Sequence, residues 1–147
     1  NYFLDDGAYL IVRLLIKMTQ LAKEGKKLGD LISDLKMPVE ETEIRMKLLC
    51  DEFKAYGNMI LEKLSGYADI NKDFISVKVN YEGLRVSFSE NCGDGWFLLR
   101  LSLHDPIMPL NIESNKEGGT KIIAQKLYDF LKDFKNLDIS PLLKYIS

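Results

Sequence analysis

The stretch WFLLRLSLHDPIMPLNIE, residues 96–113, decides the fold. Apolar side chains alternate with others along WFLLRLS (96–102) and again along IMPLNIE (107–113), and a period of two is typical of half-buried strands. The Leu-His-Asp-Pro segment at 103–106 separates the two runs, so the stretch predicts a strand, a tight loop and a second strand. Pro109 has no N–H to give to a neighbouring strand, and it predicts an edge position or a bulge.

Other segments carry the same two kinds of pattern. Strict alternation predicts strands at EIRMKL (43–48), ISVKVN (75–80) and LRVSFS (84–89). Apolar residues spaced by three and four predict helices over 51–65 and 116–134, and Ser-Pro at the start of SPLLKYI (140–146) predicts one more helical turn. From Glu43 the order is β-α-β-β-β-β-α, which predicts an α+β fold with an antiparallel sheet of about four to five strands and two covering helices.

Residues 1–37 have a different character. Helical spacing predicts a helix over 8–24, with Asp5 and Asp6 before its start and Gly25 after its end, and a short second helix over 28–35. PVEET at 38–42 predicts a polar linker. Two helices without a sheet cannot bury their own apolar side chains, so we expect residues 1–37 to be the end of another domain and residues 43–147 to be a separate one.

The composition excludes several classes of protein. The net charge is −2 and the isoelectric point is about 5.5, which argues against a nucleic-acid partner. Arg13 and Lys17 interrupt the N-terminal apolar run, so no membrane span is predicted. Cys50 and Cys92 form neither a disulfide framework nor a metal-ligand spacing, and they favour a cytoplasmic location.

Three motifs suggest ligands but fail on inspection. DINKDF (69–74) has acidic spacing typical of a calcium loop, but Phe74 and Asn80 stand where glycine and glutamate are needed. GDGWFL (93–98) lacks the third glycine and the helix of a dinucleotide site. KEGG (116–119) lies near a helix start, where an anion could bind, but a flexible cap is the more common role. No metal site is predicted.

The loop mouth at residues 100–105 is the best candidate for chemistry. Arg100 and Ser102 are two apart on a predicted strand, so both side chains should point to the same face. A guanidinium fork and a hydroxyl suit phosphate oxygens, and the amides of Leu103, His104 and Asp105 could add a concave nest. The alternatives are a salt-bridged hairpin and, for His104, either a general base or a solvated side chain.

The order of these features resembles the C-terminal part of the α-D-phosphohexomutases, the superfamily of phosphomannomutases and phosphoglucomutases. The resemblance runs from residue 1 to about Lys132, through FLDDGAYLIVRLL, ETEIRMKL, YEGLRVSF, GWFLLRLSLHDP and LNIES. Its most specific part is Gly-Trp at 95–96, then Arg-Leu-Ser at 100–102, then Pro106. Family members read Arg-x-Ser-Asn/Gly-Thr-x-Pro there, in a loop that binds the substrate phosphate.

The resemblance assigns roles residue by residue. Arg100 and Ser102 match the phosphate-binding arginine and serine of the family. Leu103 and His104 replace the usual asparagine or glycine and the usual threonine, so Leu103 can offer only its backbone and His104 offers an imidazole in place of a hydroxyl. Asp105 stands where an acidic residue is common.

Asn111 is a further departure, because many members carry arginine there. The resemblance implies that residues 1–37 are the closing helices of the third phosphohexomutase domain and residues 43–147 the fourth, phosphate-binding domain with a short extra tail. In the family a phosphoserine, an Asp-x-Asp-x-Asp magnesium motif and a sugar-reading loop lie in the first three domains, and none of these motifs occurs in this sequence.

The implied function is that of a fragment of a phosphohexomutase, an isomerase of carbohydrate metabolism that interconverts hexose 1-phosphate and hexose 6-phosphate. The whole enzyme would use Mg²⁺, a phosphoserine and a hexose bisphosphate activator, and this chain would bind the phosphorylated hexose with no catalytic residue of its own. We therefore expect no mutase activity from the chain alone. The alternative is a non-catalytic phosphosugar-binding homologue or a stand-alone binding module.

Overall fold

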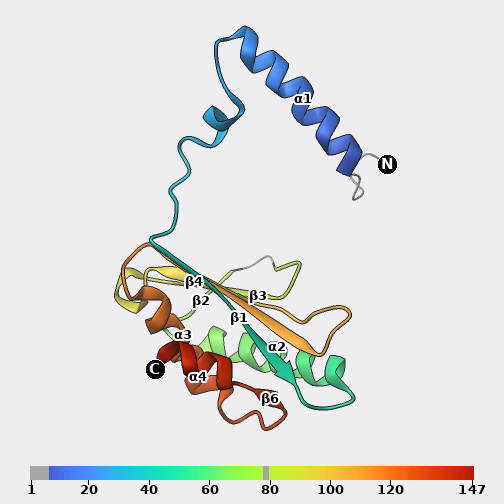
Figure 1. The fold of residues 1–147 in the computed structure, drawn as a ribbon. Coiled ribbons are helices and arrows are strands. Elements are labelled where there is room, and N and C mark those ends of the chain that lie inside the picture. The colour runs from blue at the N-terminus through green and yellow to red at the C-terminus, as the bar shows by residue number, and fades with distance from the viewer. Residues whose placement is uncertain (1–6, 78–79) are drawn as a thin grey trace. The chain divides into compact units, whose positions relative to one another are not determined.

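The computed structural model describes residues 7–77 and 80–147 (Figure 1). The fold is α+β with an antiparallel sheet and helices, which confirms the predicted class. Contacts divide the chain into two units, Asn1–Met37 and Pro38–Ser147. In chain order the elements are α1 (Gly7–Lys23), the 3-10 helix η1 (Leu28–Ile32), β1 (Glu40–Leu48), α2 (Phe53–Ile70), β2 (Ile75–Ser76), β3 (Leu84–Phe88), the 3-10 turn η2 (Glu90–Cys92), β4 (Gly95–Leu99), β5 (Ile107–Ser114), α3 (Gly119–Leu131), β6 (Leu137–Asp138) and α4 (Ser140–Ile146).

The first unit is built from α1 and η1, and the expected helix over 8–24 is confirmed. A Schellman motif ends α1. Gly25 has φ +70°, the N–H of Lys26 donates to the carbonyl of Leu21 at 2.9 Å, and the N–H of Gly25 donates to the carbonyl of Ala22 at 3.1 Å. The predicted role of Gly25 is therefore confirmed.

The apolar side chains of α1 are mostly exposed. Leu21 is the one buried residue of the helix, whereas Leu10 and Ile11 are each 59% exposed. The expected N-terminal cap, Asp5 and Asp6, lies outside the described residues. The pattern agrees with the expectation that two helices without a sheet leave apolar side chains unburied.

The second unit is a sheet whose helices α2, α3 and α4 all lie on one face (Figure 1). Within the described residues the sheet has six strands in the order β2-β3-β4-β5-β1-β6, and every neighbouring pair is antiparallel. The longest pair joins β1 to β5, in a register that runs from Glu40 opposite Ser114 to Lys47 opposite Ile107. The chain therefore places its first strand beside β5, which lies about sixty residues later in the sequence.

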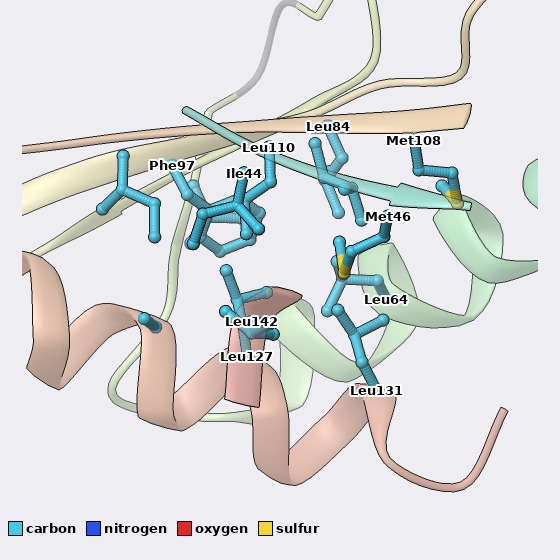
Figure 2. Close-up of a cluster of buried hydrophobic side chains, with 14 of the residues drawn as sticks. Ile44, Met46, Leu64, Leu84, Phe97, Met108, Leu110, Leu127, Leu131 and Leu142 are labelled. Atoms are coloured by element: carbon cyan, nitrogen blue, oxygen red, sulfur yellow. The ribbon is translucent and has the colours of Figure 1, made fainter. Parts of the chain in front are cut away.

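Side chains on the covered face form the core, and Figure 2 shows how they fill the space between the sheet and the helices. Strand alternation supplies Ile44, Met46 and Leu48 from β1 and Met108, Leu110 and Ile112 from β5, while the helices supply Ile60, Leu64, Ile123, Leu127, Leu131 and Leu142. Each fully buried side chain of this size contributes about 1.5–3 kcal/mol relative to an exposed one.

Several predicted boundaries are wrong. β1 begins at Glu40, so most of the expected linker at 38–42 is strand. α2 continues to Ile70 because Ala68 extends its buried face beyond the predicted end. Of the strand expected over 75–80, Ile75 and Ser76 form β2, and residues 78–79 lie outside the described part. β6 was not predicted, because a strand of two residues is too short to show an alternation of apolar and polar side chains.

Pro109 also corrects a prediction. β5 is a central strand, flanked by β4 and β1, and not the expected edge or bulge. The backbone of Pro109 faces β4, because its carbonyl accepts the N–H of Arg100 at 3.1 Å. The N–H that proline lacks would have faced β4 just beyond Leu99, the last residue of that strand, where the regular pairing ends.

Gly93 and Gly95 of GDG (93–95) and Gly119 of KEGG (116–119) allow close packing at the opposite end of β4 from the Arg100 loop. A side chain at Gly119 would collide with the carbonyl of Gly93 and with Ser114, and one at Gly95 would collide with the backbone of β5. The buried Ser114 hydroxyl fills the remaining space and donates to the carbonyl of Gly93 at 2.6 Å. Neither motif forms the phosphate loop whose pattern it suggests.

Glu40 joins the start of β1 to the start of α3. Its carboxylate accepts the N–H of Gly118 at 2.7 Å, the N–H of Thr120 at 3.2 Å and the hydroxyl of Thr120 at 2.7 Å. The same hydroxyl lies 2.8 Å from the phenol oxygen of Tyr145 in α4. The Thr120 hydroxyl, followed by the Gly118 N–H, lowers the pKa of Glu40, so the carboxylate acts as a charged cap for α3.

Glu40→Gln should therefore destabilise the second unit at pH 7 by about 1 kcal/mol, because the amide loses the charge and one acceptor oxygen. A carboxyl with a lowered pKa stabilises the fold above its unfolded pKa and loses that effect as the pH falls through the folded value. The difference in stability between Glu40→Gln and the wild type should thus shrink as the pH falls below 4.5, the ordinary pKa of a glutamate side chain.

Urea unfolding followed by the fluorescence of Trp96, the single tryptophan of the chain, measures this difference. Glu41→Gln is the matched control, because Glu41 is exposed and points away from α3. Equal stability of Glu40→Gln and the wild type at pH 7, or an equal deficit at both pH values, would contradict a capping role for Glu40.

Candidate functional site

The candidate site begins where the β4–β5 hairpin stops being a regular ladder. Arg100 and Ser102 were expected inside a strand, but β4 ends at Leu99 and both residues lie just beyond it. Their N–H groups still donate to β5, to the carbonyl of Pro109 at 3.1 Å and the carbonyl of Ile107 at 2.9 Å. Two residues that donate at alternate positions to the same strand keep their side chains on a common side.

No N–H from β5 returns to this segment. Pro109 has none, and the N–H of Ile107 donates to the carbonyl of Asp105 at 2.7 Å instead. Residues 100–102 are therefore attached to β5 by bonds in one direction, and the chain is free to leave the sheet as a loop over 103–106.

The Ser102 hydroxyl organises that loop. It accepts the N–H of Asp105 at 3.3 Å, so this amide is directed at the serine and not into the nest that the sequence suggested. A hydroxyl that accepts one hydrogen bond still has its own proton to donate. Ser102 can thus be fixed by the loop and bind an anionic oxygen at the same time.

Leu101 anchors the loop to α2. Its side chain lies so close to Gly57 that a methyl group at Gly57 would stand 2.6 Å from one of its terminal carbons. The same methyl group would stand 3.3 Å from the side chain of Leu48 in β1. Because Gly57 has no side chain, the side chain of Leu101 can pack directly against the backbone of α2.

Gly83 fixes the other side of Arg100. It has φ +143°, a conformation that favours glycine. A side chain at Gly83 would collide with the carbonyl of Leu99 and would lie 2.8 Å from the Cβ of Arg100. Gly83, at the end of the β2–β3 turn (residues 80–83), thus packs directly on the backbone that carries the candidate arginine.

A pocket of about 530 Å³ lies where these three segments meet. Arg100, Ser102 and Leu103 line it from the hairpin loop, and Glu82 and Gly83 line it from the β2–β3 turn. The remaining lining residues are Lys54, Asn58 and Leu61 of α2, together with Tyr81 and Leu101. Its volume lies within the range of about 300–1,000 Å³ that is usual for small-molecule sites.

The two cations of the pocket have no anionic partner within the described residues. Neither the Arg100 guanidinium nor the Lys54 ammonium forms an ion pair or a side-chain hydrogen bond there, although Lys54 lies 6.0 Å from the ring centre of Phe53. Arg45, through a 2.6 Å hydrogen bond, is the main cause of the lowered pKa of Glu43, and Arg100 contributes a smaller charge effect. Both cations are therefore unpaired among the described residues, and the Arg100 charge acts on the face of the sheet that carries Glu43.

Three residues singled out from the sequence lie away from the pocket. His104 and Asp105 are exposed and do not line it. Asn111, on β5, donates from its side-chain amide to a carboxylate oxygen of Glu43 at 3.4 Å. The structure thus gathers Arg100, Ser102 and Leu103 at the pocket and leaves the other candidates outside it.

Lys54, Asn58 and Glu82 are the pocket residues that sequence reasoning missed. Lys54 and Asn58 are four residues apart and flank Gly57, a spacing that puts them on one face of the predicted helix. The spacing of Lys54 and Asn58 could be recognised in the sequence, but nothing in the sequence indicates which loop lies against this face of the helix.

In the part of the chain that the structure describes, no three histidine, cysteine, aspartate or glutamate side chains gather in a way that could hold a metal ion. Both cysteines are free thiols. Over the same described residues, no helix combines the length and the apolar character that a membrane crossing requires.

Comparison with known proteins gives one kind of match. No family model matches the sequence, and no curated protein matches it. Among solved structures, the chain is similar to the crystal structure of a phosphoglucomutase/phosphomannomutase family protein from Burkholderia thailandensis, with 25% sequence identity and a TM-score of 0.56. The match covers 91% of this chain and 26% of that chain, so the sequence spans about a quarter of the length of that protein. The similarity connects the α+β fold to the phosphoglucomutase/phosphomannomutase superfamily.

The geometry around Gly83 predicts a specific cost for Gly83→Ala. The added methyl group meets backbone atoms that cannot rotate away, so the second unit should lose about 1–3 kcal/mol beyond the conformational penalty of a positive φ. Amide resonances of residues 99–102 should shift at the same time.

Gly118→Ala is the matched control, since Gly118 also has a positive φ, +72°, but has no atom within 4 Å of the added methyl. Urea unfolding and amide spectra of both variants measure the difference. Equal destabilisation by the two substitutions, or unshifted amides at 99–102, would show that Gly83 does not hold Arg100 in place.

Proposed function

We propose that the Pro38–Ser147 unit binds the phosphate group of a phosphorylated hexose, as the phosphate-binding domain of a phosphohexomutase of the phosphomannomutase/phosphoglucomutase type. The observation that carries the proposal is the pairing of Arg100 and Ser102 at one pocket, on a backbone fixed by β5, with no partner for the guanidinium among the described residues. The fold similarity to a phosphoglucomutase/phosphomannomutase family protein supports it.

The chemistry of the two side chains fits a phosphate monoester. The guanidinium of Arg100 offers parallel N–H donors that match two phosphate oxygens, and Ser102 offers its hydroxyl proton to a third. Charge-assisted hydrogen bonds of this kind contribute roughly 1.5–3 kcal/mol each. Leu103, at the rim, adds apolar cover.

The proposed task of the loop is positioning. Holding the phosphate that does not react fixes the orientation of the sugar, so that its other end meets the phosphoserine of the whole enzyme. The proposal places that phosphoserine, the Mg²⁺ that offsets charge on the transferred group and the binding of a hexose bisphosphate activator in other domains. It assigns α1 and η1 to the end of a preceding domain, and the chain alone is expected to show no turnover.

Amide chemical-shift titration of the 147-residue chain with mannose 6-phosphate tests the proposal. Shifts should cluster at residues 100–103 and in the β2–β3 turn, with a dissociation constant on the order of millimolar because one unit alone leaves the ligand largely hydrated. Arg100→Ala should weaken binding by well over tenfold, on the order of a hundredfold, because both charge-assisted hydrogen bonds of the guanidinium are lost.

Arg45→Ala is the matched control, because Arg45 is an exposed arginine of the same sheet that does not line the pocket. It should bind as the wild type does, and His104→Thr should change little, since His104 is exposed outside the pocket. Shifts that cluster elsewhere, or that survive Arg100→Ala unchanged, would refute the site.

A further inference from the structure

The face of the sheet that carries no helix, called here the open face, is the face on which the candidate side chains lie. Leu99 is fully buried and Leu101 packs against the core, so the side chains at these two positions point toward the helices. Because side chains alternate along an extended segment, Arg100 and Ser102 point to the opposite face, away from α2, α3 and α4 (Figure 1). A ligand bound by Arg100 and Ser102 therefore meets the other side chains of the open face.

Glu43 and Asn111 are the polar neighbours of Arg100 on the open face. Asn111 of β5 pairs with Leu98 of β4 on one side and with Glu43 of β1 on the other. Leu98 lies two residues before Arg100, so all four side chains share the open face. Neighbouring strands are about 4.8 Å apart, so β1 lies about 10 Å from the strand that leads to Arg100. A phosphorylated hexose is long enough to extend from Arg100 to Asn111 and Glu43.

The charges of Arg100 and Glu43 act on the same space without contact. The two side chains form no ion pair within the described residues. The pKa of Glu43 is nevertheless lowered by the Arg100 charge, after the larger effects of the hydrogen bonds from Arg45 and Asn111. The guanidinium and the carboxylate thus face a common region of the open face.

The two oxygens of Glu43 have different surroundings. Oε1 accepts the Nε–H of Arg45 on the same strand at 2.6 Å, whereas Oε2 is turned across the sheet to the side-chain amide of Asn111, at 3.4 Å. A carboxylate oxygen can accept more than one hydrogen bond, so Oε2 keeps acceptor capacity on the side of β5. The carboxylate is held in place, but the oxygen on the side of Arg100 is still able to bind a ligand.

The open face has opposite charges at its two ends. Glu43 and Asn111 line a hollow of about 380 Å³ together with Glu41 and Glu113, which lie farther along the strands from Arg100. Carboxylates at this end would repel a second phosphate, but they accept hydrogen bonds from hydroxyl groups. The arrangement therefore favours a ligand with one anionic end at Arg100 and a hydroxylated body directed toward Glu43.

We propose that the Oε2 atom of Glu43 and the side-chain amide of Asn111 bind hydroxyl groups of the sugar whose phosphate is bound by Arg100 and Ser102. The inference rests on the proposed function of the Arg100 loop and extends it from phosphate binding to selection of a sugar phosphate over phosphate alone.

Two probes, inorganic phosphate and mannose 6-phosphate, separate the roles when each is titrated into the full chain and its variants. The quantity compared is the ratio of the two dissociation constants. Glu43→Gln should bind inorganic phosphate equally well or more tightly because a negative charge is removed, whereas mannose 6-phosphate should bind several-fold more weakly because its hydroxyl groups lose a charged acceptor. Asn111→Ala should weaken mannose 6-phosphate several-fold and leave inorganic phosphate unchanged.

Glu41→Gln is the matched control, because Glu41 is an exposed carboxylate on the same strand and face but lies opposite Glu113, one step farther from Arg100. It removes the same charge and should change both probes by one factor, so that the ratio stays that of the wild type. The side-chain amide resonances of Asn111 should shift with mannose 6-phosphate and not with inorganic phosphate. Amide spectra establish that each variant is folded.

The outcomes distinguish this inference from the proposed function. If Arg100→Ala loses both probes while Glu43→Gln and Asn111→Ala keep the ratio of the wild type, the phosphate site stands and the hydroxyl-binding role is wrong. A change of the ratio in Glu41→Gln as large as that in Glu43→Gln would also contradict the role of Glu43. If Arg100→Ala binds both probes as the wild type does, both proposals fail together.

Discussion

A hydrogen-bond ladder that runs in one direction determines the candidate site. Arg100 and Ser102 donate their N–H groups to β5, but β5 returns no N–H, because Pro109 has none and Ile107 donates to Asp105. These two hydrogen bonds, half of those that a regular antiparallel ladder would form here, hold the backbone of residues 100–102 against β5. The missing half releases the chain into the loop at 103–106. A fixed backbone next to a free loop is what a binding side chain needs if it is to be preorganised and still accessible.

Close approaches position this segment from both sides. Gly83 lies on the backbone of Arg100, and Gly57 receives the side chain of Leu101, so the β2–β3 turn and α2 define two walls of one pocket. At the other end of β4, the capping carboxylate of Glu40 ties the start of α3 to β1. The helical layer is thereby held on one face of the sheet.

Much of the fold could be predicted from the sequence, because strand and helix periods depend on which residues meet the core. The alternation of Ile44, Met46 and Leu48 is an example, and all three are buried. Period alone does not say which strands pair, so the central position of β5 was missed. The rule that proline avoids central strands was misleading here, because the lost N–H faces a point where the ladder to β4 already ends. Arg100 and Ser102 could be predicted from a local pattern, whereas Lys54, Asn58 and Glu82 join the pocket through contacts between distant segments.

The central claim is that the Arg100 loop binds the phosphate of a phosphorylated hexose. A crystal structure of the chain grown with saturating mannose 6-phosphate tests it most directly. The account predicts phosphate density at the Arg100 loop, with the Arg100 guanidinium and the Ser102 hydroxyl within hydrogen-bonding distance of its oxygens. Phosphate bound at another surface with no density at the Arg100 loop, or a sugar phosphate seated without contact to Arg100, would contradict it.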